Sequence, residues 1–168
     1  MSPTPHLLAL ALFPVPHLCM ATPLEITGEL VPTTCEVVAQ GGALTVAMGR
    51  IDVATINTGM HVARKEFSID LDCAGVAGPQ QVGIRFSGRT DGSSGNLALT
   101  PGGAGNVGVA LYDAAGNRQQ IGKDPLQWLD ITAFRRSQLV YSASYASPAG
   151  NATAGPANAS ADLVVVYK

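Results

Sequence analysis

The sequence predicts an all-β protein, with a β-sandwich as the leading architecture, and three observations support this. Short segments in which apolar and polar residues alternate recur after residue 21, whereas helical periodicity is hard to find there. Charged residues make up only 13% of the chain, which contains 19 Gly and 11 Pro, a composition that favours many short strands joined by turns. The length of 168 residues suits one domain with its own core.

The first 21 residues differ from the remainder of the chain. They include no Lys, Arg, Asp or Glu, and their apolar run from Leu7 to Val15 is too short to span a bilayer. Pro14 and Pro16 interrupt that run. We expect a secretory signal peptide cleaved after Ala21, although the usual cationic start is missing. The alternative is a start codon placed upstream of a truncated signal, and in both cases the segment is a poor candidate for folded structure.

Alternation places the expected strands in order along the chain. In the segment 24–30, Leu24, Ile26, Gly28 and Leu30 share one face, and the segments 65–73, 80–88 and 138–146 alternate in the same way. The segment 124–138 is ambiguous and could hold one helical turn or a loop. The full set of expected strands is 24–30, 43–49, 65–73, 80–88, 96–100, 106–113, 138–146 and 161–168.

The cysteines predict a disulfide. Removal of a signal peptide would remove Cys19 and leave Cys35 and Cys73, and an even pair in an exported chain favours a disulfide. Two unpaired buried thiols are the alternative. A metal site would need more ligands than the two Cys and one His of the remaining chain.

Residues able to support catalysis are scarce, so we expect no enzyme, no cofactor and no metal. A catalytic triad would depend on His61, which lies in a polar connector and fits a solvated loop histidine better. Asp70 and Asp72 share one outward strand face, and the Gly-rich stretch 102–108 lacks the Lys-Ser/Thr ending of a phosphate-binding loop. The net charge of −2 gives no electrostatic reason to expect nucleic acid or an anionic membrane as a partner.

Several motifs occur together in a fixed order. Gly28 stands seven residues before Cys35, Cys73 closes a later strand, an Asn-Val-Gly-Val strand begins at residue 106, and Tyr167 is penultimate. With the stretches "LEITGELVPTTCEV", "FSIDLDC", "NVGVALYDAAGN", "YSASYAS" and "ADLVVVYK", the chain resembles a type 1-type fimbrial (pilin) subunit of the chaperone–usher pathway. The resemblance covers residues 22 to 168.

That resemblance implies an incomplete immunoglobulin-like β-sandwich that lacks its last strand and is completed by donor-strand exchange. It divides the chain into a signal peptide (1–21), an N-terminal donor-strand extension (22–32) and a pilin domain (33–168). The implied site residues are a disulfide of Cys35 and Cys73, a donor strand of Leu24, Ile26, Gly28 and Leu30, and an acceptor groove and chaperone anchor of Leu163, Val165, Tyr167 and Lys168. If 24–30 were instead the first strand of its own sandwich, the protein would be a self-contained monomer.

The implied function is a structural subunit that polymerises head to tail into a surface fibre for cell adhesion and biofilm formation. The implied partners are a periplasmic chaperone, an outer-membrane usher, neighbouring subunits and, through the assembled fibre, a host glycan receptor. The chain would pass through the periplasm to the fimbrium at the cell surface. A minor adaptor, terminator or tip subunit with a binding (adhesin) role is the alternative, and an exported enzyme is a more distant one. The outward Val164 and Val166 are unusual for the last strand, and we hypothesise that the segment 124–138 contacts them.

Overall fold

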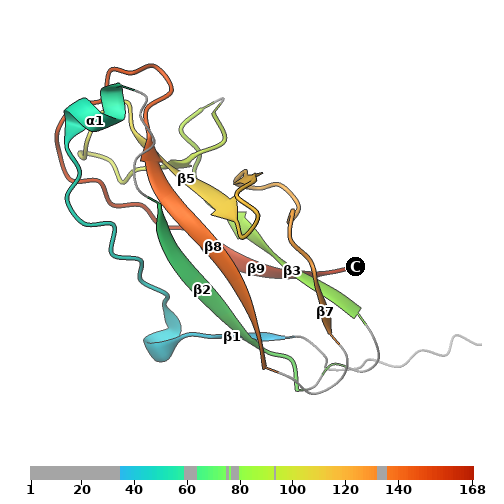
Figure 1. Cartoon of the computed structure of the whole chain (residues 1–168). Coiled ribbons are helices and arrows are strands. Elements are labelled where there is room, and N and C mark those ends of the chain that lie inside the picture. The colour runs from blue at the N-terminus through green and yellow to red at the C-terminus, as the bar shows by residue number, and fades with distance from the viewer. Residues whose placement is uncertain (1–34, 59–63, 75, 77–79, 93, 132–135) are drawn as a thin grey trace, which may run out of the picture. The chain divides into compact units, whose positions relative to one another are not determined.

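A computed structural model describes residues 35–58, 64–74, 76, 80–92, 94–131 and 136–168 (Figure 1). They belong to one compact unit, Val31–Lys168. The expected signal peptide 1–21, the donor segment 22–32 and His61 lie outside the described residues.

The larger of two antiparallel sheets is built around β8, the longest strand, which pairs with β2 on one side and β5 on the other. The strand order is β1-β2-β8-β5-β4, and β6 also pairs with β5. The strands are β1 (Glu36–Val38), β2 (Lys65–Asp72), β4 (Leu97–Ala98), β5 (Gly108–Asp113), β6 (Arg118–Gln119) and β8 (Arg136–Ala146).

The smaller sheet has the order β7-β3-β9, with β7 (Leu129–Ile131), β3 (Gln80–Ser87) and β9 (Asp162–Tyr167). Its inward side chains meet those of the larger sheet: the ring of Phe86 on β3 lies edge-on to that of Tyr141 on β8, with centroids 5.0 Å apart. Both rings are buried, as are Ile69 and Leu71 of β2, Val82 and Ile84 of β3, and Leu139 and Ala143 of β8, while Phe67 of β2 is half-buried against this core. The predicted all-β sandwich is therefore confirmed, and its core lies between the sheets.

Two short helical segments occur among the described residues. The turn η1 (Gln40–Gly42) follows β1, and the helix α1 (Val53–Asn57) follows an extended stretch. Helix α1 was not predicted because five residues are too few to show a helical period. Its start is capped by the Asp52 carboxylate, which accepts a hydrogen bond from the Ala54 N–H at 3.3 Å. Within the described part of the chain, no helix is long and apolar enough to cross a membrane.

Most of the expected strands are present with boundaries shifted by one or two residues. The expectation for 43–49 was wrong, because this segment has no regular secondary structure and joins no ladder formed by the described residues. The strands β1, β6 and β7 were not predicted, and β7 lies in the ambiguous segment 124–138. These three strands have two or three residues each, too few for alternation to be recognised, and pairing with a neighbour defines them.

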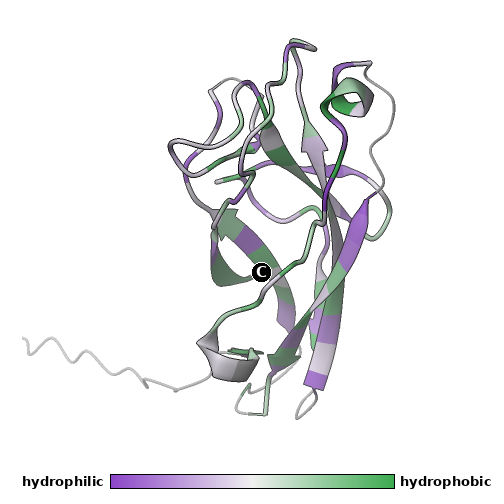
Figure 2. Cartoon of the chain, turned by 90° about the vertical axis from the view of Figure 1, so that its left-hand side faces the viewer, coloured by the Kyte–Doolittle hydropathy of each residue, from purple (hydrophilic) through white to green (hydrophobic). Residues whose placement is uncertain are grey.

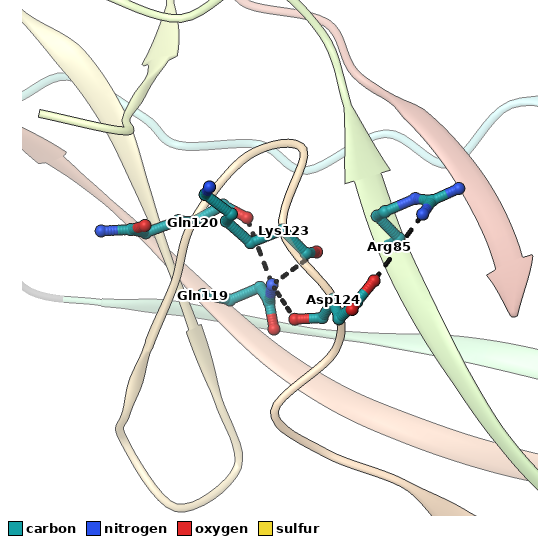
Figure 3. A network of polar contacts seen from close by, with 5 residues as sticks. All are labelled: Arg85, Gln119, Gln120, Lys123 and Asp124. Carbon is teal, nitrogen blue, oxygen red and sulfur yellow. Dashed lines mark hydrogen bonds and ion pairs between the residues drawn. The ribbon is translucent and has the colours of Figure 1, made fainter. Parts of the chain in front are cut away.

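The segment before β7 folds over the outer face of β3 (Figure 3). The buried amide of Gln119 donates to the carbonyls of Gln120, Lys123 and Asp124 at 3.2, 3.4 and 3.2 Å, and Asp124 forms an ion pair with Arg85 at 3.7 Å. A Cβ at Gly83 would lie 2.8 Å from the ring of Pro125.

Gly83 is the register partner of Val166 on β9. This pairing places Pro125 beside the outward valines, which supports the hypothesised contact with the segment 124–138.

Candidate functional site at the open edge of β9

Strand β9 has a partner on one edge only. It pairs antiparallel with β3 along its whole length, from Asp162 opposite Ser87 to Tyr167 opposite Val82. Among the described residues no strand pairs with its other edge. The backbone N–H and C=O groups on that edge are thus available to a further strand.

The inward face of β9 is only partly covered. Leu163, Val165 and Tyr167 stand opposite Phe86, Ile84 and Val82 of β3, which are 2%, 0% and 0% exposed. All three β9 side chains pack against the core, yet each remains half-buried. An inward side chain of a complete sandwich is covered from both neighbouring strands, so this exposure is explained by the missing neighbour.

Tyr167 ties one end of the open edge to the larger sheet. Its hydroxyl oxygen accepts a hydrogen bond from the backbone N–H of Cys35, the residue before β1. Cys35 forms a disulfide with Cys73, the residue after β2, which confirms the predicted pair. The end of β9 is therefore connected to the start of β1 and, through the disulfide, to the end of β2.

The segment 43–52 joins η1 to α1 (Figure 2), and its residues Gly49–Ile51 line a second side of the site. Met48 and Ile51 pack against the core while remaining half-buried, like the inward residues of β9. Within the described residues, the backbone of 43–51 makes no hydrogen bond to another segment. With respect to the part of the chain that the structure describes, this segment therefore also presents unpaired backbone groups.

A pocket of about 560 Å³ lies at the other end of the site, near the start of β9. Residues Gly49–Ile51 form one side and Thr153–Asn158 the other, with Tyr145 among the lining residues. The Tyr145 hydroxyl donates to the Ala157 carbonyl at 2.7 Å, and burial raises the pKa of Tyr145. We call this pocket, together with Met48, Ile51, Leu163, Val165 and Tyr167, the open strip.

Hydrogen bonds hold the loop beside the pocket. The Asn57 side chain of α1 accepts from the Ala152 N–H at 2.6 Å and donates to the Ala152 carbonyl at 3.1 Å. Gly103 and Pro156 are in close contact, because a Cβ at Gly103 would lie 2.2 Å from the Pro156 carbonyl oxygen. Only glycine fits at position 103, so the loop that contains Pro156 packs closely against the backbone of Gly103.

Lys168 extends the β3–β9 ladder by one pair. Its N–H donates to the Gln81 carbonyl at 3.0 Å, and the Gln81 N–H donates back to the Lys168 carbonyl at 3.3 Å. The ammonium group lies 5.2 Å from the centre of the Trp128 ring, within range of a cation–π contact. The expected chaperone-anchoring residue is thus exposed beside the open strip.

The structure brings Leu163, Val165, Tyr167 and Lys168 together with the disulfide, while the four expected donor residues lie outside the described residues. Sequence reasoning missed Met48, Ile51 and the pocket. The sequence feature that could have indicated this part of the site is the alternating segment 43–49, which we interpreted as an ordinary strand.

The carboxylates considered for catalysis lie on the outer surface. Asp70 accepts a hydrogen bond from the Gln138 side chain at 2.7 Å, and Asp72 forms an ion pair with Arg136 at 3.6 Å. No group of three or more His, Cys, Asp or Glu side chains in the described ranges could hold a metal ion. The candidate site is therefore an apolar strand edge in an immunoglobulin-like sandwich, which is typical of a binding or assembly module.

Comparison with known proteins identifies the family. The profile of the fimbrial protein family matches residues 24–168, so the chain belongs to that family. It is 28% identical over 157 residues to a type-1 fimbrial protein subunit of Serratia marcescens, with 86% of each chain covered. The resemblance to type 1-type fimbrial subunits is confirmed.

Solved structures show the same fold. The P pilus rod subunit PapA superposes with a TM-score of 0.65 at 17% identity, over 80% of this chain and 99% of that one. A chain from the structure of a chaperone–usher pilus gives 0.64 at 17% identity, over 92% and 98%. A Burkholderia pseudomallei antigen and type I fimbria protein gives 0.52 at 26% identity, over 79% and 88%. The family makes the chain a structural subunit of a cell-surface fimbrium that contacts neighbouring subunits, and not an enzyme.

Proposed function

We propose that this subunit polymerises by donor-strand exchange, in which residues 24–30 of one copy fill the open strip of the next. One observation carries the proposal: among the described residues β9 is paired on one edge only, and its inward Leu163, Val165 and Tyr167 stay half-buried. A strand added to such an edge gains main-chain hydrogen bonds and covers the apolar side chains.

The donor segment has the right chemistry for that strip. Leu24, Ile26 and Leu30 share one face and can cover apolar side chains, whereas Gly28 brings its backbone close to the floor. Between β9 and 43–51, an inserted strand would have unpaired backbone groups on both sides. Every ladder in the two sheets is antiparallel, so we infer antiparallel insertion.

The same open edge supports a need for a chaperone. A half-covered apolar edge strand aggregates when it is left free. We therefore propose that the segment 1–21 directs export, that a periplasmic chaperone covers the strip with contacts at Lys168, and that an outer-membrane usher receives the subunit. The resulting fibre would serve cell adhesion and biofilm formation.

The experiment that tests this proposal measures binding of a labelled peptide of residues 22–32 to the oxidised full chain. Val165→Thr should weaken binding by about 5- to 150-fold, because a hydroxyl without a partner costs about 1–3 kcal/mol in a covered strip. Val164→Thr is the matched control, since Val164 points to the outer face, and it should leave affinity unchanged within about twofold. A peptide carrying Gly28→Val should bind poorly because its added side chain meets the floor.

Polymerisation should appear as ladders that resist SDS at low temperature and collapse on boiling. A soluble monomer that captures no peptide would instead indicate that 24–30 completes its own domain. Equal effects of the Val164 and Val165 substitutions would also contradict the proposal.

A further inference from the structure

Large hydrophobic side chains are exposed at three places within the described residues. Val38 is 45% exposed, Leu44 41% and Leu126 54%. Val38 and Leu44 lie on either side of η1, and we call these two residues the base patch. Leu126 belongs to the segment that covers the outer face of β3.

The base patch lies only a short chain distance from the donor segment. Cys35 is fixed by the disulfide to Cys73 and by its hydrogen bond to Tyr167, so the folded body begins there. This inference rests on the donor-strand exchange proposed above. In that arrangement residue 32 marks the point where the chain leaves the neighbour's open strip, and Cys35 follows it after three peptide bonds. Three steps span at most about 11 Å. The incoming body is therefore held against the accepting copy, and Val38 is close to the point of contact.

The antiparallel direction of insertion determines which part of the accepting copy the incoming copy contacts. It places Leu30 of the donor near Asp162, at the end of the strip where the pocket lies. The segment Thr153–Asn158 lines that pocket and is mostly small: Thr, Ala, Gly, Pro, Ala, Asn. The base patch of the incoming copy would emerge beside this segment.

The two segments themselves are uncharged. Residues 37–49, which include the base patch, contain no Lys, Arg, Asp or Glu, and neither do residues 147–161. The nearest charges are Asp70, the register partner of Val38, and Arg50, which lines the pocket beside 153–158. Because interface cores are depleted of charged side chains, we expect these two charges at the rim of the contact.

We propose that the base patch, Val38 and Leu44, docks on the segment 153–158 of the accepting copy, as a second contact beside the inserted strand. The occupant of this surface is a second copy of the same chain. Because the donor strand already tethers the two bodies, even a small apolar contact is formed at high effective concentration. The contact slows release of the subunit from the polymer.

The test uses polymers of the full chain formed under oxidising conditions. Val38→Thr with Leu44→Gln removes the apolar patch, and Val38→Thr keeps the β-branched shape that the β1–β2 ladder favours. Leu126→Gln is the control, because it removes a leucine that is even more exposed than Leu44, 54% against 41%, from the segment that covers the outer face of β3. The readout is the rate at which SDS-resistant ladders are lost at one fixed temperature below boiling. Capture of the labelled peptide 22–32 is measured on the same variants before polymerisation, while the open strip is free.

We expect the Val38/Leu44 double variant to dissociate about tenfold faster than wild type, and Leu126→Gln to match wild type within about twofold. Peptide capture should be equal in all three proteins, because the patch lies outside the strip. Equal dissociation of the double variant and Leu126→Gln polymers, with peptide captured normally, would overturn this inference alone. If wild type captures no peptide, donor-strand exchange itself fails, and the inference fails with it.

Discussion

Tyr167→Phe tests whether the cross-sheet hydrogen bond supports the open edge of β9. The substitution keeps the ring against the core but removes the acceptor for the Cys35 N–H. Cys35 is 3% exposed, so its N–H has little access to water as a replacement partner. Leaving such a donor unsatisfied costs about 1–3 kcal/mol. For a domain of this size, that corresponds to a fall in melting temperature of roughly 3–9 °C.

The assay is thermal unfolding followed by circular dichroism, on the oxidised chain saturated with peptide 22–32. Peptide affinity is measured for each variant, because ligand binding itself raises the melting temperature. Tyr112→Phe is the control: this ring lies under the Arg64 guanidinium, and its hydroxyl makes no hydrogen bond to the described residues. The control should shift the melting temperature by less than about 2 °C. Equal shifts for Tyr167→Phe and Tyr112→Phe would refute the role given to the Tyr167–Cys35 bond.

Three further predictions concern stability. Replacing Cys35 and Cys73 with Ser opens a loop with a sequence separation of 38, so chemical denaturation should show a loss of about 4 kcal/mol. Burial raises the pKa of Tyr141 to about 12, with a smaller contribution from nearby Asp113, whereas the unfolded chain titrates near 10. The unfolded state therefore loses this proton first, and stability should fall by about 2–3 kcal/mol between pH 10 and pH 12. Tyr141→Phe should remove that part of the alkaline loss and change stability at pH 7 by no more than about 1 kcal/mol, since the hydroxyl completes no hydrogen bond among the described residues although the nearby Ile84 backbone partly offsets the rise of its pKa. Gly83→Ala should destabilise by about 1–3 kcal/mol through its clash with Pro125, and an added Pro125→Gly should restore much of the loss in a double-mutant cycle.

The expected site could be assembled from the sequence only in part. Leu163, Val165 and Tyr167 were assigned to the inward face by the family resemblance, and the register with Val82, Ile84 and Phe86 agrees with that face. The family resemblance, rather than alternation, predicted that this strand would lack a partner. Met48 and Ile51 were missed as part of the site, because an alternating sequence marks a strand-like segment but not the strand beside it.

The sequence by itself determined the longer strands β2, β3, β5, β8 and β9, the faces of β2, β3 and β8, and the pairing of Cys35 with Cys73. These follow from local properties: a period of two residues, turn-forming residues, and a cysteine pair in a chain expected to be exported. Tertiary structure alone decided that 43–51 pairs with no other described segment, that 129–131 becomes a strand, and that the Tyr167 hydroxyl reaches the Cys35 N–H across 132 residues of chain. The physical reason is that hydrogen bonds between segments depend on which backbone N–H and C=O groups lie close together in space. The packing of the two sheets determines which of these groups are neighbours.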